Sequence, residues 1–239
     1  MCQKSNIMVT QQRILSLIIT VLILLSTCCI AQQKDTVRIR EGYVGMVGYG
    51  SLMSLKSMES TLGHQYSDSV YSIHLNGFIR SWTSYRLFND PKAENSKKPS
   101  FNAYILEDAD SIPFDGIVQL NVESQENRKI NCILYIISDE DIINFDKREF
   151  GYDRIEVTDK VDEFLILGGK VFVYQQAPGY YNSSTLNLKK FILIEDYLNM
   201  ITKACDERGE SFRNEYDKST LPPSFQVVPS HKVAWKMVQ

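Results

Sequence analysis

The stretch that decides the fold reads Val44-Gly45-Met46-Val47-Gly48-Tyr49-Gly50-Ser51-Leu52-Met53. Its apolar first half has the β-propensity of a buried strand, and Gly48 and Gly50 allow another backbone or a ligand to approach closely. We therefore predict a strand that ends in a tight loop, followed by a helix over residues 52–60 with Ser51 as its N-cap.

Such a loop leaves several backbone N–H groups directed at one place. A cluster of these donors suits a carboxylate or a developing oxyanion. The alternative is structural, because a short Gly-Ser sequence on its own often forms nothing more than a turn. The motif needs a second, independent feature before it indicates a site.

Composition favours one globular domain. The chain has 239 residues, of which 44% are hydrophobic, enough for a sizeable core in a single α+β or barrel domain. The formal net charge is −3, and the lysines and arginines are scattered. Since no basic stripe is present, we expect no nucleic-acid partner.

Residues 1–31 read as an export signal. Lys4 and Arg13 precede an apolar run over residues 14–25, and small residues lead to Ala31. We predict cleavage after Ala31, an exported protein (periplasmic or extracellular), and a mature domain over residues 32–239 with a C-terminal helical extension. The alternatives are a retained membrane anchor or lipidation at Cys28 or Cys29, and membrane attachment is expected through this segment alone.

The remaining cysteines and histidines give no metal pattern. Cys132 and Cys205 either pair or stay as buried free thiols. The chain has no Cys-x-x-Cys, and its three histidines are dispersed in the sequence. We therefore expect neither a metal nor another cofactor.

Secondary-structure patterns indicate a strand-rich first half and a helical end. Strands are predicted over residues 70–78, 79–88, 101–106, 112–122, 130–137, 152–157 and 170–174, with a polar loop over 89–100. Helices are predicted after Ser138, from Leu188 to Cys205, and over residues 210–216. The predicted fold class is α+β, a single-domain mixed or antiparallel β-barrel with flanking helices.

Glu149 stands where the helix after Ser138 gives way to a strand. A carboxylate is electrostatically disfavoured at the carbonyl end of a helix, which suggests a purpose other than stability. The structural alternatives are a solvated acid within a row of charges or an ion-pair partner of Arg80 or Arg154.

Two separated segments together resemble the gamma-glutamylcyclotransferase-like family. The first is Tyr49-Gly50-Ser51-Leu52, and the second is Phe145-Asp146-x-x-Glu149-x-Gly-Tyr152-x-Arg154-Ile-x-Val157. In that family a Tyr-Gly-Ser-Leu or Tyr-Gly-Ser-Asn loop precedes a Leu-Asp-x-x-Glu-x-x-Tyr-x-Arg segment. The order and the spacing agree, and phenylalanine replaces the usual leucine at position 145.

The resemblance implies a compact α+β barrel that carries both motifs at one mouth. Glu149 would be the general base, and Tyr49, Gly50, Ser51, Leu52 and Tyr152 would bind the substrate. The implied partner is a small γ-glutamyl compound with a free α-amine, which cyclises to 5-oxoproline and releases an amine or an amino acid. The alternative is a non-catalytic binding or interaction protein that keeps the barrel, with the site filled by Phe150 or Tyr180.

Overall fold

The computed structural model describes residues 34–88, 101–108, 110–177 and 189–237. The predicted leader, the predicted loop over 89–100 and Tyr180 lie outside these residues. One compact unit spans Thr36–Gln239. Among the described residues, no helix is long and apolar enough to cross a bilayer.

The elements of this unit are rich in strands. Up to position 138 they are β1 (Asp35–Arg38), β2 (Tyr43–Gly48), η1 (Ser51–Met53), α2 (Leu55–Leu62), β3 (Val70–Leu87), β4 (Phe101–Glu107), β5 (Asp110–Phe114) and β6 (Gly116–Ser138). After it come α3 (Ile142–Arg148), β7 (Tyr152–Glu156), η3 (Thr158–Lys160), β8 (Phe164–Leu167), β9 (Val171–Gln176), β10 (Phe191–Ile194), α5 (Glu195–Asp206), α6 (Glu210–Ser219), β11 (Val227–Val228), η4 (Ser230–Lys232) and β12 (Val233–Met237).

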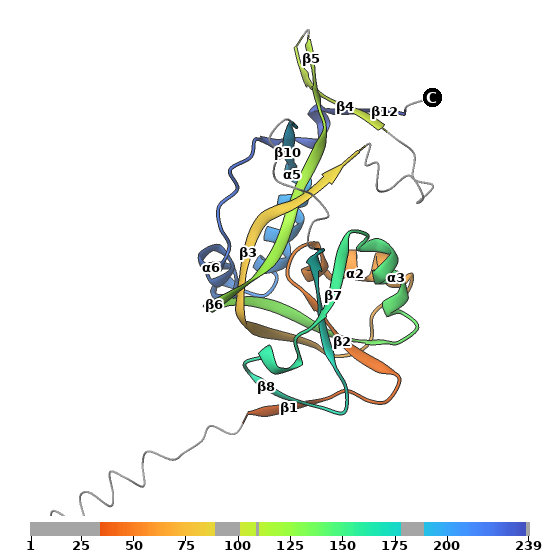
Figure 1. The fold of residues 1–239 in the computed structure, drawn as a ribbon, viewed down its shortest axis with the longest axis vertical. Helices are drawn as coiled ribbons and strands as arrows, with labels where there is room; N and C mark the ends of the chain where they lie inside the picture. The colour runs from red at the N-terminus through yellow and green to blue at the C-terminus, as the bar shows by residue number, and fades with distance from the viewer. Residues whose placement is uncertain (1–33, 89–100, 109, 178–188, 238–239) are drawn as a thin grey trace, which may run out of the picture. The chain divides into compact units, whose positions relative to one another are not determined.

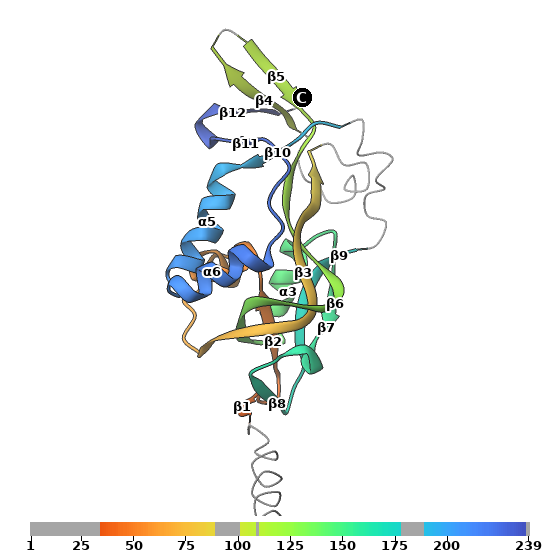
Figure 2. The ribbon, with the colours of Figure 1, turned by 90° about the vertical axis from the view of Figure 1, so that its left-hand side faces the viewer.

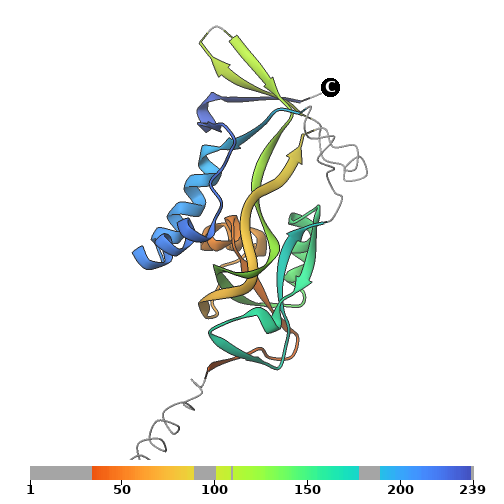
Figure 3. The ribbon, with the colours of Figure 1, turned by 60° about the vertical axis from the view of Figure 1, so that its left-hand side comes forward.

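The described strands form one large mixed sheet and two small ones. The large sheet has seven strands in the order β11-β10-β6-β2-β9-β7, with β3 paired to β6. Strands β2, β3 and β6 pair antiparallel, whereas β9 and β10 pair parallel to their neighbours β2 and β6. The long β3–β6 pair runs through the unit (Figure 1), with α5 and α6 on one side and β7 and β9 on the other (Figures 2 and 3).

The predicted α+β class is confirmed, and the core lies mainly within the large sheet. Its fully buried side chains include Met46, Ile133, Phe145 and Val173. A smaller buried cluster lies by the sheet β12-β4-β5 and contains Ala103, Ile105, Phe114, Ile192 and Val228. Among the described strands, the pairings form an open sheet, and none of them closes this sheet into a barrel.

Two predicted strand boundaries were wrong. Residues 70–78 and 79–88 were predicted as separate strands, but they belong to β3, and residues 116–138 likewise form one strand, β6. Gly77 has a φ of +81°, and the register between β3 and β6 shifts between Asn76 and Phe78. The glycine therefore marks a bulge inside a strand, which sequence alone does not distinguish from a turn.

Three predicted helix starts were also wrong. The helix expected from Leu188 begins at Glu195, because the four apolar residues before it form β10 between β6 and β11. Ser54 caps α2, accepting from the Ser57 N–H at 3.4 Å, so the predicted cap Ser51 instead opens the short turn η1. Helix α3 begins at Ile142, and Ser138 binds the N–H of its N-cap residue at 3.0 Å.

Candidate active site

The loop after β2 folds back tightly onto the end of that strand. A side chain at Gly48 would place its Cβ 2.5 Å from the backbone oxygen of Leu52, so the approach requires glycine. Tyr49 and Leu52 are buried, and Ser51 is half-buried. Because η1 begins at Ser51, the first N–H groups of the turn have no acceptor within it. The loop can therefore offer backbone donors to a ligand.

Glu149 closes helix α3, and its side chain is mostly buried. The backbone N–H of Glu149 donates to the Phe145 backbone oxygen at 2.8 Å, and the backbone oxygen of Glu149 accepts from the Tyr152 N–H at 2.9 Å. The side chain is 17% exposed. Burial raises the pKa of its carboxyl above the ordinary value, and the positive charges of Arg148 and Arg86 offset part of that rise. Such a carboxylate is suited to accepting a proton.

Arg148 joins the two predicted segments. Its Nε lies 3.1 Å from the Glu149 Oε1, and its Nη2 donates to the Ser51 Oγ at 3.0 Å, across 97 positions of sequence. Nη2 also donates to the Ser57 Oγ, and Nη1 donates to the Ser57 backbone oxygen, both at 2.9 Å. Thr61 Oγ1 accepts a further hydrogen bond from Nη1. The structure thus brings Glu149 and the loop to one place.

Arg148 was not among the predicted site residues because it stands in a run of charges. A usable signal was present on the other segment. Hydroxyl residues recur every three or four positions there, at Ser51, Ser54, Ser57 and Thr61. Hydroxyls at this spacing lie on one side of a helix, and the spacing therefore predicts a hydrogen-bond donor or acceptor that packs against that side.

Tyrosine hydroxyls line the interior beside the loop. Tyr152 donates to the Ser84 Oγ and, at 3.4 Å, to the Leu120 backbone oxygen. Tyr197, on α5, accepts from the Leu120 N–H at 3.2 Å. A Cβ at Gly50 would lie 3.3 Å from the Tyr197 hydroxyl, so the loop packs directly against it. The predicted residues Gly50 and Tyr152 therefore lie in one neighbourhood, and Tyr197 is an addition to it.

These hydroxyls stay protonated near neutral pH. Burial raises the pKa of Tyr49, of Tyr152 and of Tyr197 well above the ordinary value, and the charge of Glu149 adds to the rise in each case. A phenol that keeps its proton can donate a hydrogen bond to a substrate.

The rest of the second motif anchors the helix that carries Glu149. Asp146 accepts from the Tyr174 hydroxyl at 2.7 Å and forms an ion pair with Arg154 at 3.3 Å. The Arg154 guanidinium lies 5.2 Å from the centre of the Phe172 ring. Arg154 is thus the partner of Asp146, and the Glu149 partner is Arg148. The alternative of a Glu149–Arg154 pair was wrong.

Arg86 adds a positive charge on the same side of β3 as Ser84. Side chains alternate along a strand, so Ser84 and Arg86 share one face. Tyr85, between them, packs on the other face against Phe191 and Phe225, with ring centres 5.0 and 5.9 Å away. Arg86 is exposed, and its charge lowers the pKa of Tyr152 as well as that of Glu149.

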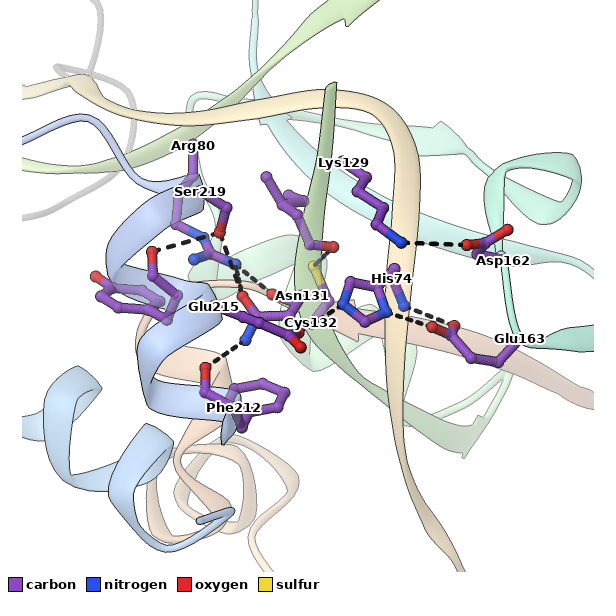
Figure 4. A network of polar contacts seen from close by, with 12 residues as sticks. His74, Arg80, Lys129, Asn131, Cys132, Asp162, Glu163, Phe212, Glu215 and Ser219 are labelled. Atoms are coloured by element: carbon purple, nitrogen blue, oxygen red, sulfur yellow. Dashed lines mark hydrogen bonds and ion pairs between the residues drawn. The ribbon is translucent and has the colours of Figure 1, made fainter. Parts of the chain in front are cut away.

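A second polar cluster, centred on His74, lies between β3, the segment that joins η3 to β8, and α6 (Figure 4). Nδ1 of His74 pairs with Glu163, whose Oε2 also accepts from the His74 N–H at 2.7 Å. Nε2 lies 2.7 Å from the Glu215 Oε2. Beside them Lys129 and Asp162 pair at 3.6 Å. The hydrogen bond to Glu163 is the main cause of the raised pKa of His74.

Arg80 lies fully buried next to this cluster. The ion-pair partner of Glu149 is Arg148, so the predicted alternative of a Glu149–Arg80 pair was wrong. It donates to Thr220 at 2.8 Å and to the Asn131 backbone oxygen, and its guanidinium lies 4.5 Å from the Tyr216 ring centre. Cys132 and Cys205 are buried free thiols. Within the described residues, no group of three or more His, Cys, Asp or Glu side chains is arranged to hold a metal ion.

No protein-family model and no curated protein sequence matches this chain. Among solved structures, one described as "Gamma-glutamyl cyclotransferase" shares 12% identity with a TM-score of 0.44, over 77% of this chain and 90% of its own. The chain is similar in fold to that protein. An uncharacterized protein from Homo sapiens shares 12% identity (TM-score 0.42; 78% and 92% covered), and a protein from Arabidopsis thaliana shares 13% (0.33; 71% and 95%). Identities this low show a likeness of fold alone.

Proposed function

We propose that this protein is a cyclotransferase, which closes a γ-glutamyl group with a free α-amine to 5-oxoproline. The observation that carries the proposal is the placement of a mostly buried Glu149 carboxylate, with a raised pKa, beside a loop of backbone donors. We also propose that the Glu149 carboxylate and the loop face one substrate cavity.

Glu149 supplies the step that the reaction lacks without a catalyst. An α-amine is protonated at neutral pH and has no free electron pair with which to attack. The Glu149 carboxylate takes a proton from the ammonium, and its raised pKa favours that transfer. The free amine then attacks the γ-carbonyl carbon of the same molecule. Nucleophile and electrophile are already joined, so ring closure carries little entropic penalty.

The loop supports the second half of the reaction. As the new C–N bond forms, negative charge develops on the γ-carbonyl oxygen, which backbone N–H groups of residues 50–52 can stabilise. The old C–N bond then breaks as the leaving nitrogen receives the proton that Glu149 took up. The freed Glu149 carboxylate accepts the second proton lost by the ring nitrogen and passes it to the released amine or to solvent. Tyr49 and Tyr152, as neutral phenols, can hold the substrate by hydrogen bonds. The exposed charge of Arg86 favours a substrate that carries a carboxylate.

The alternative of a non-catalytic binding protein predicted that Phe150 or Tyr180 would fill the site. Phe150 is 44% exposed, so its ring does not serve as a buried plug. Tyr180 lies outside the described residues.

The test is release of 5-oxoproline by the purified protein. A panel of γ-glutamyl dipeptides, γ-glutamylamines and trimmed muropeptides should contain at least one substrate. The matched control for each compound is its α-N-acetyl derivative, which has lost the nucleophile and should give no product. A panel without any 5-oxoproline would favour the binding alternative.

We further propose that the protein is exported and that the mature chain begins near Gln32, as residues 1–31 predict. N-terminal sequencing of the native protein should read from this position. An intact Met1 in protein extracted only by detergent would instead support an anchor, and labelling by a lipid precursor would support lipidation at Cys28 or Cys29.

A further inference from the structure

All three nitrogens of the Arg148 guanidinium have partners within the protein. Its two terminal nitrogens make four hydrogen bonds, to the Ser51 hydroxyl, to the Ser57 hydroxyl and backbone oxygen, and to the Thr61 hydroxyl. The remaining nitrogen, Nε, lies 3.1 Å from the Glu149 Oε1. A planar guanidinium bound along its whole edge has little freedom to rotate or to withdraw.

The two carboxylate oxygens of Glu149 have different surroundings. Arg148 approaches Oε1, and among the described residues it is the ion-pair partner of this carboxylate. Because the terminal nitrogens are occupied by α2 and the loop, Arg148 has no donor left for a substrate. A substrate ammonium entering beside the loop would therefore meet the other oxygen, Oε2.

We propose that Arg148 is a positioning residue that holds the Glu149 Oε1 against the loop, so that Oε2 is the atom that accepts the proton. The inference rests on the proposed cyclotransferase function. It assigns to Arg148 no contact with the substrate. Its effect is to fix the distance between the base on α3 and the donors of the η1 loop, two segments that are far apart in sequence.

A purely structural role is the competing explanation, because the same contacts tie α3 to α2. The two explanations differ in what they predict for turnover. If Arg148 only joins the helices, its loss lowers the melting temperature, and the protein that stays folded keeps the wild-type kcat. If it positions the carboxylate, kcat falls in the folded protein as well. Under both explanations the loss of a positive charge 3.1 Å from Oε1 raises the pKa of Glu149 further.

The test compares Arg148→Gln and Arg148→Lys with Lys147→Gln as the matched control. Lys147 is exposed on the same helix, so its replacement removes the same charge without touching the pair. For Arg148→Gln we expect kcat to fall about 10²-fold, as for a misplaced catalytic group, with little change in KM, and the acidic limb of the kcat profile to move to higher pH. Arg148→Lys should keep the acidic limb near its wild-type position, because the positive charge remains. Its kcat should still fall, because a single ammonium cannot make the several hydrogen bonds of the planar guanidinium.

A second readout does not depend on turnover. The Glu149 side-chain carboxyl, labelled with 13C and assigned by its absence in Glu149→Gln, is titrated by NMR in wild type, Arg148→Gln and Lys147→Gln. A higher pKa in Arg148→Gln alone shows that the pair exists in solution; if no compound of the panel is turned over, the proposed function fails while the pair stands. With a substrate in hand, a lowered kcat in folded Arg148→Gln supports the positioning role. Identical titrations, or a folded Arg148→Gln protein with unchanged kcat, would overturn the inference.

Discussion

The Glu149 charge lies where a protein would not place one for stability. It is mostly buried at the carbonyl end of α3, and burial outweighs Arg148 and Arg86 in setting its raised pKa. Each unit of such a shift corresponds to about 1.4 kcal/mol between the two protonation states. Burial therefore makes the protonated form of Glu149 less unfavourable than it is for an exposed glutamate, and the same burial assists proton uptake from a substrate.

His74 gives a prediction for the pH dependence of stability. Its pKa is raised, so the stability that its pairs contribute is fully present below about pH 6.5 and is lost as pH rises through the raised value. The pKa of Glu163 is lowered, so its share is lost as pH falls through that value. Melting temperatures should therefore decrease above neutral pH, and His74→Gln should flatten that decrease.

The control for this measurement is His231→Gln, which replaces a histidine of η4 outside the cluster. Lys129, Asp162 and Glu215 also face the cluster. If His74→Gln and wild type lost stability in parallel between about pH 6 and 9, the assignment to His74 would be wrong.

At the scale of elements, the β2–η1 loop depends on Gly48. A Cβ there would lie 2.5 Å from the Leu52 backbone oxygen, so Gly48→Ala must displace the loop. We expect a loss of about 1–3 kcal/mol in the free energy of unfolding, as for overpacked sites, together with a loss of turnover. Urea denaturation and 5-oxoproline release measure the two effects.

Gly63→Ala is the comparison for this variant. Gly63 has a φ of +81° at the end of α2, with open space around it, so alanine there strains the backbone by about 1 kcal/mol without a clash. Its turnover should stay near wild type. A Gly48→Ala protein with full stability and full turnover would show that the loop tolerates displacement.

Sequence patterns predicted the elements around the site better than their boundaries. The strand before Gly48 and the helix before Glu149 were expected from apolar patterning and turn residues, and both exist. The start of α5 was misplaced because four apolar residues before Glu195 fit a helical stripe as well as a buried strand. Only pairing with β6 and β11 decides between them, and that pairing involves segments far apart in sequence.

The same limit explains the residues of the site that were missed. Tyr49, Gly50, Ser51, Leu52, Glu149 and Tyr152 were expected together because their two motifs resemble one family. Arg148 and Tyr197 meet them through contacts between separate elements, which no local spacing records. The spacing of the hydroxyl residues indicates that they have a partner, but only the fold identifies that partner as Arg148.

At the scale of the whole unit, the two hydrophobic clusters should differ in stability. Trp82 is 5% exposed in the main core, with its ring centre 6.4 Å from that of Tyr197. Trp235 is 49% exposed beside Phe88 and Phe114, near the small cluster. Because few buried contacts hold the small cluster, we expect it to open first.

Two single-tryptophan proteins measure this order. Trp82→Phe leaves fluorescence from Trp235, and Trp235→Phe leaves it from Trp82. In urea, the Trp235 signal should change at a lower concentration than the Trp82 signal. Coincident transitions would show that both clusters unfold as one cooperative unit.

The most direct test of the central claim is the rate of 5-oxoproline release by wild type and Glu149→Gln, with the melting temperature taken on the same preparations. The exchange keeps shape and hydrogen-bonding reach and removes basicity. We predict a rate lower by about 10²- to 10⁴-fold, with ligand binding retained and a melting temperature equal to or slightly above that of wild type. An active Glu149→Gln protein would contradict the catalytic role of this residue, and a large fall in melting temperature would show that its carboxylate serves the fold.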